Sequence, residues 1–235
     1  MNNLFIRSFS IDWDAVLQGS YLRRIPALAG LESLEFESPV TLFAGDNQTG
    51  KSTLLEAIAV CAGFNAEGGT LNYSFSTYEG DRSELAEAMR LVRGFRRPQV
   101  GSFLRAESFF NVASAALTEY NFDGLMEDWH SESHGESFLS FIRKYRQPGL
   151  FLMDEPEAAL SPRRQLELLR HVEEQAAAGS QYLIVTHSPI LLGIGGAHIL
   201  SFDGGAVRPC SYEEADSYQV MRAFLDGRTC PMPER

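Results

Sequence analysis

The chain has 235 residues, of which 44% are apolar and 22% are charged, and its formal net charge is −11. This composition is that of a globular protein with a sizeable core, so it excludes a disordered, collagen-like or coiled-coil chain. The acidic balance argues against a protein that coats nucleic acid through bulk positive charge, although it leaves room for a local basic patch.

The three cysteines, Cys61, Cys210 and Cys230, are odd in number and far apart in the sequence. They indicate neither a disulfide framework nor a zinc site, and we expect a protein of the reducing cytoplasm. No apolar stretch approaches the roughly 20 residues that a membrane-spanning helix needs, and the first residues do not resemble a signal peptide. We therefore expect no direct insertion into a membrane.

Apolar runs and turn residues predict strands that alternate with helices. Strands are expected at 4–11, 34–37, 40–44, 100–106, 150–153 and 182–185, with a hairpin at 199–207. Helices are expected at 51–62, 83–93, 108–119, 136–145 and 162–179. The last helix is expected to bury a stripe of Leu166, Leu169, Val172 and Ala176. This alternation indicates an α/β fold with a largely parallel sheet.

The strongest chemical signal is a segment that fits the phosphate-loop pattern G-x-x-x-x-G-K-[ST]. Its residues are Gly45, Asp46, Asn47, Gln48, Thr49, Gly50, Lys51, Ser52 and Thr53. The glycines let the backbone wrap so that N–H groups point at phosphate oxygens, and the following helix aims its positive end at the same anion. We expect Lys51 to reach the β- and γ-phosphates and the Ser52 hydroxyl to bind Mg²⁺.

Polar residues follow two of the expected strands. Asp154 and Glu155 come directly after the apolar run at 150–153, and His187 follows the run at 182–185. We expect Asp154 to hold Mg²⁺ directly or through water, and Glu155 to accept a proton from the attacking water. His187 is suited to contact the γ-phosphate or to orient that water. Because ligands gather at the carboxyl ends of parallel strands, these residues are expected to meet the phosphate loop there.

A weaker signal is the segment Ser133-His134-Gly135-Glu136, which precedes the helix expected at 136–145. The N–H groups of Ser133 and Gly135 are suited to cap a phosphate. Two other interpretations stay open, namely an ordinary helix cap and a metal site formed by His130 and His134 with the neighbouring glutamates. The metal site is less favoured because no further histidine or cysteine cluster completes it.

In this order, the motifs resemble those of the ABC-type ATPase superfamily of P-loop NTPases. Residues 45–53 resemble its Walker A motif, LFLMDE (150–155) its Walker B motif, and SHGE (133–136) its signature motif. EAALSP (157–162) resembles its D-loop, and His187 its switch histidine. Stretches such as FLRAESFFNVAS and DEPEAALSPRRQ look like those of small stand-alone bacterial ATPases, which are closer to the chromosome-maintenance and DNA-repair branch than to transporter subunits.

The resemblance covers most of residues 35–205. It implies a single ATPase domain over 1–235, with an N-terminal antiparallel β portion and a helical subdomain at about 65–148. It also implies a Q-loop residue that contacts Mg²⁺ and water, for which Glu107 is preferred over Gln99. An aromatic that stacks on adenine is expected before the phosphate loop, and Tyr21 is the candidate.

Several residues depart from the superfamily's pattern. The signature motif has Glu132 and His134 where Leu and Gly are usual, and the D-loop has Ser161 where Asp is usual. No sustained heptad pattern separates the phosphate loop from the signature motif, so the long coiled coil of the chromosome-type ATPases is excluded.

The resemblance implies a mechanism in which two subunits enclose two ATP molecules with Mg²⁺. Ser133 and Gly135 of one subunit would touch the γ-phosphate that the other subunit holds. The leading hypothesis is an ATPase that dimerises on ATP and drives a DNA-linked or defence-related process through DNA or an effector protein. The alternative is the nucleotide-binding subunit of a membrane transporter. A non-hydrolysing module and a small-molecule kinase are less favoured.

Five arginines, Arg90, Arg93, Arg96, Arg97 and Arg105, lie close together in the sequence. They indicate either a local patch for nucleic acid or a partner, or a solvated helix face followed by a turn. We favour the solvated face.

Overall fold

The computed structural model describes residues 4–71, 83–105 and 134–227 of the chain. These residues form two sheets, a seven-stranded sheet in the order β10-β9-β3-β8-β7-β6-β4 and a three-stranded sheet in the order β2-β1-β5. The large sheet contains β3 (Val40–Ala44), β4 (Gly69–Thr70), β6 (Gly101–Arg105), β7 (Leu150–Asp154), β8 (Gln181–Val185), β9 (His198–Ser201) and β10 (Arg208–Cys210). The small sheet contains β1 (Ile6–Ile11), β2 (Ser33–Glu35) and β5 (Met89–Arg93).

Strands β9, β3, β8, β7 and β6 of the large sheet are parallel, and its two edge strands β10 and β4 are antiparallel to their neighbours. The small sheet is antiparallel throughout. The predicted α/β class, the largely parallel sheet and the N-terminal antiparallel portion are therefore confirmed. The hairpin predicted at 199–207 is also present, as β9 and β10.

The α-helices among the described residues are α1 (Pro26–Ala29), α2 (Lys51–Ala62), α3 (Glu84–Ala88), α6 (His134–Arg143), α7 (Pro162–Ala177) and α8 (Asp216–Leu225). Short 3₁₀ turns are η1 (Tyr21–Arg24), η2 (Pro156–Ala159), η3 (Leu191–Gly193), η4 (Asp203–Gly205) and η5 (Tyr212–Glu214). Gly63 ends α2 in the left-handed conformation that favours glycine at a helix cap. Within the described ranges, no helix has the length and apolar character to cross a bilayer.

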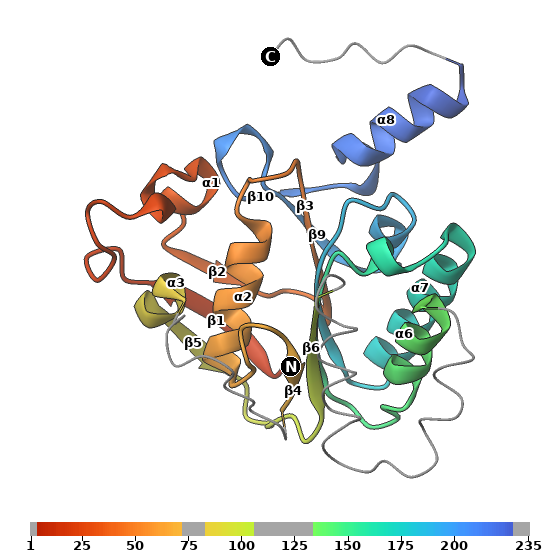
Figure 1. The fold of residues 1–235 in the computed structure, drawn as a ribbon, viewed down its shortest axis with the longest axis horizontal. Coiled ribbons are helices and arrows are strands. Elements are labelled where there is room, and N and C mark those ends of the chain that lie inside the picture. The colour runs from red at the N-terminus through yellow and green to blue at the C-terminus, as the bar shows by residue number, and fades with distance from the viewer. Residues whose placement is uncertain (1–3, 72–82, 106–133, 228–235) are drawn as a thin grey trace.

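The large sheet lies between two layers, with α2 and the small sheet on one face and α6 and α7 on the other (Figure 1). All residues of the central strands β3, β7 and β8 are buried, as expected for a parallel sheet that is covered on both faces. Alternate side chains enter the two cores. Phe43, for example, packs on the α2 side, whereas Leu42 packs on the α7 side.

A buried amide joins the two sheets. Gln181, at the start of β8, is 1% exposed, and its Oε1 accepts hydrogen bonds from the N–H groups of Phe5 and Ile6 at 2.9 Å each. Its Nε2 donates to the carbonyl of Ile6 at 2.8 Å. All three bonds satisfy backbone groups at the start of β1, so Gln181 fixes where the small sheet meets the large one.

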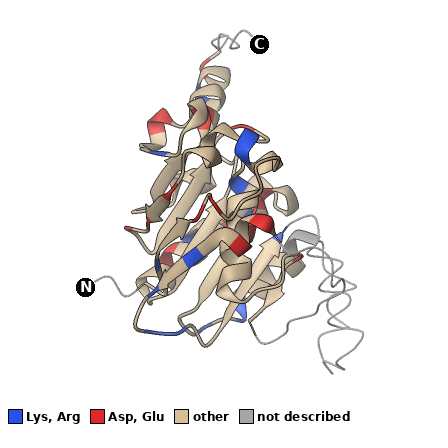
Figure 2. Ribbon diagram, turned by 90° about the vertical axis from the view of Figure 1, so that its left-hand side faces the viewer, with Lys and Arg blue, Asp and Glu red and all other residues tan. Residues whose placement is uncertain are grey.

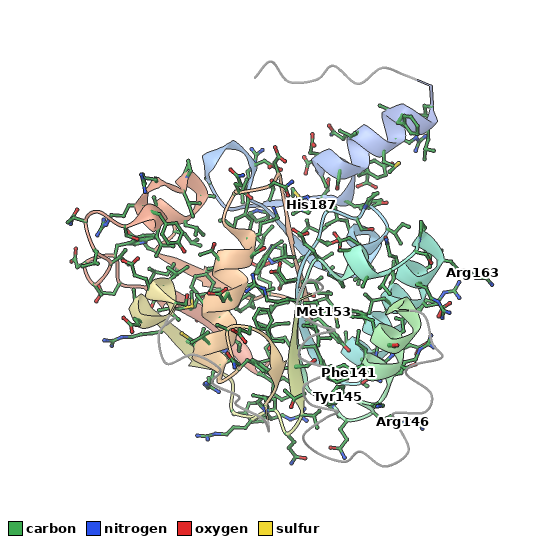
Figure 3. The ribbon with its side chains drawn as sticks, viewed as in Figure 1. Phe141, Tyr145, Arg146, Met153, Arg163 and His187 are labelled. Atoms are coloured by element: carbon green, nitrogen blue, oxygen red, sulfur yellow. The ribbon has the colours of Figure 1, made fainter. Side chains whose placement is uncertain are left out.

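Aromatic rings connect α6 to the large sheet. The ring centroids of Phe141 and Tyr145 are 5.5 Å apart, those of Tyr145 and Phe151 are 5.4 Å apart, and Phe151 stacks on Tyr182 at 5.0 Å. Phe141 and Tyr145 lie close together below Met153 in Figure 3. The phenol of Tyr145 is largely removed from solvent among these rings, and this burial raises its pKa to about 12. The helix predicted at 136–145 is thus present, and it is anchored to β7 and β8.

The helix predicted at 83–93 was wrong in its second half. Only α3 is helical, and the chain then enters β5, which pairs with β1 along Met89–Arg93. Leu85 and Ala88 are buried as a helical face requires. Strand β1 offers an unpaired edge on that side, however, and the backbone bonds along it override local helical propensity.

The helix expected for the five arginines was also wrong, although Arg90, Arg93, Arg96 and Arg97 are exposed, as expected. Arg90 and Arg93 lie on β5, and Arg93 donates to the carbonyls of Cys61 and Ala62 at the end of α2. The guanidinium of Arg96 lies 5.7 Å from the centre of the Phe5 ring, and Arg105 lies on β6. Figure 2 shows basic residues on several elements rather than gathered on one face.

The buried face of α7 differs from the predicted stripe. Val172 is buried and Leu169 and Ala176 pack against the core, as predicted. Leu166, however, is 47% exposed, and Gln165 and Leu168 are buried instead. Gln165 turns inward because its amide bonds to two inner groups, the Ser188 hydroxyl and the Leu160 carbonyl. This polar residue was not counted in an apolar pattern, so the predicted stripe was wrong at its first residue.

Helix α8 was not predicted from the sequence, and none of its residues is buried. It stands away from the two layers at the top of Figure 1. The helix predicted at 108–119 lies outside the described residues.

Candidate nucleotide-binding site

The phosphate loop connects β3 to α2, as predicted. Gly45, Gln48 and Gly50 all have positive φ, at 137°, 63° and 95°. Gly50 is required by space as well as by conformation, because a Cβ there would lie 2.8 Å from the Leu28 side chain of α1. The loop therefore wraps tightly while α1 packs against it.

Lys51 is folded into the loop that it follows. Its Nζ donates to the carbonyls of Gly45 at 2.9 Å and Asp46 at 2.6 Å, and it lies 3.3 Å from the Thr49 hydroxyl. The residue is only 4% exposed. Burial lowers the pKa of Lys51, and nearby carboxylates, led by Glu155, oppose that shift. A cation is thus held at the centre of the loop.

The loop is also tied to the strand-end edge of the sheet through Asp203 of η4. The N–H of Asp46 donates to Asp203 Oδ1 at 2.8 Å, and a Cβ on Gly45 would lie 3.0 Å from the same oxygen. Within the loop, the Asn47 N–H donates to Asp46 Oδ1 at 2.7 Å. Asp203 was missed because no motif marks a lone aspartate beyond a strand.

Two of the predicted metal residues meet although they are far apart in the sequence. The Ser52 hydroxyl donates to Asp154 Oδ1 at 2.8 Å, and Asp154 is 7% exposed. Hydroxyl and carboxylate oxygens are the ligand types that Mg²⁺ takes, so this pair fits the ion. In the described part of the chain, no group of three or more His, Cys, Asp or Glu side chains forms an all-protein metal cage. The fit is therefore to an ion that also binds phosphate oxygens.

Arg105 is a further charge at this edge that sequence reasoning did not assign to the site. It ends β6 in register with Asp154, and its Nε lies 3.5 Å from Asp154 Oδ2. Its terminal nitrogen donates to Glu56 Oε2 of α2 at 2.9 Å. The position of Arg105 beside Asp154 follows from the parallel register of β6 and β7, which the sequence alone does not give.

Glu155 and His187 lie together at the same edge. His187 Nε2 is 3.5 Å from Glu155 Oε1, and both side chains are partly exposed. Glu155 adopts a left-handed conformation, with φ 50° and ψ 52°, which is rare for a residue with a Cβ. In Figure 3, His187 stands at the upper end of the sheet, where β3 also turns into α2.

Some of the other predicted site residues lie outside the described residues, and the rest lie at different places in the fold. Glu107 and Ser133 lie outside the described residues, and so do His130 and Glu132. Gly135 lies in the first turn of α6, one residue inside the helix rather than before it. Tyr21 lies in η1 and is 55% exposed. Gln99 precedes β6 and so lies at the opposite end of that strand from Arg105, which argues against it as the Q-loop residue.

Two segments of the chain match known protein families. Residues 20–88, which include the phosphate loop, match a family described as "AAA domain". Residues 137–193, which include Asp154, Glu155 and His187, match a family described as "AAA domain, putative AbiEii toxin, Type IV TA system".

One curated relative is the energy-coupling factor transporter ATP-binding protein EcfA2 of Streptococcus sanguinis (strain SK36). It is 28% identical over 184 residues, which amount to 69% of this chain and 66% of that protein. The match therefore leaves about a third of the relative's length uncovered.

Similar solved structures include the SMC head domain from Thermotoga maritima, with 13% identity and a TM-score of 0.47 over 88% of this chain and all of that one. A nucleotide-free ATP-binding cassette from an ABC transporter has 16% identity and a TM-score of 0.43 over 95% of both chains. Both matched families are described as AAA domains, and the two segments contain the phosphate loop and the strand-end residues, so they support an ATP-binding P-loop ATPase of the AAA/ABC type.

Proposed function

We propose that this ATPase hydrolyses Mg-ATP as an ATP-dependent dimer, and that the cycle drives a DNA-linked or defence-related partner process. The observation that carries the proposal is the convergence of Ser52, Asp154, Glu155 and His187 at one edge of the sheet. That convergence supplies ligand oxygens, a base and an imidazole beside a phosphate loop. The family description that names a toxin supports the defence-related reading.

The phosphate loop would bind the triphosphate before any chemistry. Lys51 would exchange its carbonyl partners for β- and γ-phosphate oxygens, and the N–H groups at the start of α2 would face the same anion. Ser52 and Asp154 would hold Mg²⁺, which neutralises charge on the transferred phosphoryl group when bound. Glu107 is a further candidate for that ion.

Glu155 would act as the general base. Its carboxylate follows the Mg²⁺ ligand Asp154 and faces His187 at 3.5 Å. It would accept the proton of the attacking water, while His187 would orient that water or donate to the γ-phosphate. The left-handed backbone of Glu155 supports this role, because such conformations gather at functional sites.

A second subunit would complete the site. The signature segment continues into α6, which begins at His134 and contains Gly135, and α6 covers the sheet face opposite to α2 (Figure 1). The phosphate loop leads into α2. Because the two helices lie on opposite faces, we propose that Ser133 and Gly135 donate to the γ-phosphate of the partner rather than to that of their own subunit.

Light scattering on the Glu155→Gln protein tests this proposal, because blocked hydrolysis should accumulate the ATP-bound state. We expect it to dimerise with Mg-ATP and to be monomeric without nucleotide. The control adds Lys51→Ala, which should prevent dimerisation by preventing binding. Adding Ser133→Arg should also prevent it while ATP still binds. A Glu155→Gln protein that stays monomeric at saturating Mg-ATP, or a Ser133→Arg protein that dimerises and turns over, would contradict the clamp.

The alternative function is the ATP-binding subunit of a membrane transporter, and the match to EcfA2 favours it. Capture of partners from native cells with the Glu155→Gln protein separates the two functions. A permease in the captured fraction would support the transporter subunit. DNA or a nuclease would support the leading proposal.

A further inference from the structure

We propose that Glu157 is a positioning residue that holds the backbone turn of His187, and so sets the geometry between His187 and Glu155. The inference rests on the proposed hydrolysis, in which these two residues act on the attacking water. It assigns a specific role to the first residue of the EAALSP segment, which lies two positions after the proposed base.

The first observation is a pair of hydrogen bonds from one turn to one oxygen. Glu157 Oε1 accepts from the N–H of His187 at 2.5 Å and from the N–H of Ser188 at 3.2 Å. These N–H groups follow the end of β8, where the strand ladder no longer supplies partners. The carboxylate therefore fixes the backbone from which the His187 imidazole projects.

Glu157 does this from a half-buried position. Burial raises the pKa of Glu157, and its bonds to the His187 backbone and the Thr186 hydroxyl oppose that shift. Its second oxygen, Oε2, is buried and has no hydrogen-bond partner among the described residues. Burying a carboxylate oxygen without a partner costs stability, and the carboxylate nevertheless accepts bonds from the His187 turn.

A second side chain connects the same two segments. Gln165 Oε1 accepts from the Ser188 hydroxyl at 2.6 Å, and Gln165 Nε2 donates to the Leu160 carbonyl at 3.0 Å. Both Gln165 and Ser188 are buried. Residues 157–165 thus hold the His187 turn at two points, through Glu157 and through Gln165.

The base belongs to the same unit. Glu155 is fixed to β8 by the bond from its N–H to the Val185 carbonyl at 3.0 Å, and it directly precedes η2, which carries Glu157. The 3.5 Å separation of His187 Nε2 and Glu155 Oε1 is therefore set by two adjoining turns that are bonded to each other. Removing the Glu157 carboxylate would release one of these turns and leave the phosphate loop untouched.

Three variants test the proposal. Glu157→Ala removes the acceptor, Glu157→Gln keeps a side-chain oxygen, and Glu173→Ala is the matched control. Glu173 of α7 also accepts from a loop N–H, that of Gly195, at 2.8 Å through its Oε1, but this hydrogen bond is exposed. We expect Glu157→Ala to lower kcat on the order of 10-fold with little change in KM for ATP. Glu157→Gln should recover most of kcat, and Glu173→Ala should match the unaltered protein.

A double-mutant comparison with His187→Ala shows whether the effect passes through His187. In that background, Glu157→Ala should lower kcat no further. Additive losses, an equal rise in KM, or a Glu157→Gln protein as slow as Glu157→Ala would each overturn the proposal.

A readout without turnover separates this proposal from the proposed function. The imidazole ¹H and ¹³C resonances of His187, assigned with His187→Ala, should shift in Glu157→Ala and stay in place in Glu173→Ala. That result supports the positioning role even if the chain does not hydrolyse ATP. Unshifted resonances in a folded Glu157→Ala protein would overturn the role even if hydrolysis by Glu155 is confirmed.

Discussion

The candidate site has two regions that are held in place in different ways. One is the phosphate loop, and the other, the strand-end side, consists of Asp154, Glu155 and His187 at the ends of β7 and β8. Lys51 and Thr49 bond to backbone carbonyls no more than six positions away in the chain. The strand-end side is held by bonds between distant side chains and backbone groups. Ser52 reaches Asp154 across 102 positions, and Glu157 reaches His187 across 30.

This difference separates two properties that substitutions can change independently. A loop whose lysine is held by the loop's own carbonyls, with one outside bond to Asp203, is suited to bind phosphate before the rest of the site is aligned. A strand-end cluster that depends on register and packing is suited to act on the bound nucleotide. We therefore expect loop variants to change affinity and strand-end variants to change turnover.

The largest expected effect is on turnover at the strand-end side. Glu155→Gln removes the proposed base and leaves the loop intact, so ATP affinity should be kept while kcat falls on the order of 100-fold or more. Steady-state hydrolysis and an equilibrium ATP titration measure the two quantities. Near-normal hydrolysis would remove Glu155 from the role of base.

The next largest effect is expected on the free energy of unfolding, from the packing of α7 behind the strand-end side. Leu168 of α7 is fully buried, whereas Leu166 on the same helix is 47% exposed. Leu168→Ala should lower the free energy of unfolding by about 2–5 kcal/mol, and Leu166→Ala should change it by about 0.5 kcal/mol or less. Urea unfolding of the matched pair measures both. Equal losses would contradict the orientation of α7.

This pair of leucines also shows where sequence reasoning stopped. The parallel sheet, the phosphate loop and the strand ends at Asp154 and His187 could be predicted, because each leaves a local pattern of apolar runs, glycines or charge. The first turn of the buried face of α7 could not, because Gln165 rather than Leu166 enters the core and bonds to Ser188 and Leu160. A polar residue that is buried for its hydrogen bonds is invisible to hydrophobic periodicity.

Two further misses have the same origin in tertiary structure. Strand β5 has the composition of a helix continuation and becomes a strand because β1 presents an open edge. Arg105 reads as one member of a basic cluster and becomes part of the site because β6 pairs in register with β7. Both depend on contacts between segments that no single stretch of sequence encodes.

The loop side is tested by Lys51→Ala. Its ammonium would make charge-assisted bonds to phosphate, each worth about 1.5–3 kcal/mol, so ATP affinity should fall on the order of 30-fold or more. A fluorescent ATP analogue in a binding titration measures the loss. The control is Lys144→Ala, which removes the other lysine, at a position outside the loop. Unchanged affinity in Lys51→Ala would mean that the loop does not hold the triphosphate.

The smallest expected effect lies where the two regions meet. Arg105 places a positive charge 3.5 Å from Asp154 Oδ2, while Ser52 independently holds Oδ1 at 2.8 Å. Arg105→Gln should therefore leave Asp154 in place and remove a charge that repels the ion. The Mg²⁺ concentration for half-maximal ATP binding should fall about 3-fold, since screening keeps charge effects at a partly exposed site small.

A Mg²⁺ titration of nucleotide fluorescence measures this midpoint, with Arg143→Gln as the control. Arg143 also forms an ion pair, with Glu167 at 3.0 Å, but on the outer helices α6 and α7. If Arg105→Gln instead needs more Mg²⁺, the guanidinium serves chiefly to orient Asp154. The strand-end side would then depend on a third element, β6, in addition to β7 and β8. That outcome would sharpen the contrast with the phosphate loop, which needs only its own backbone to hold Lys51 in place.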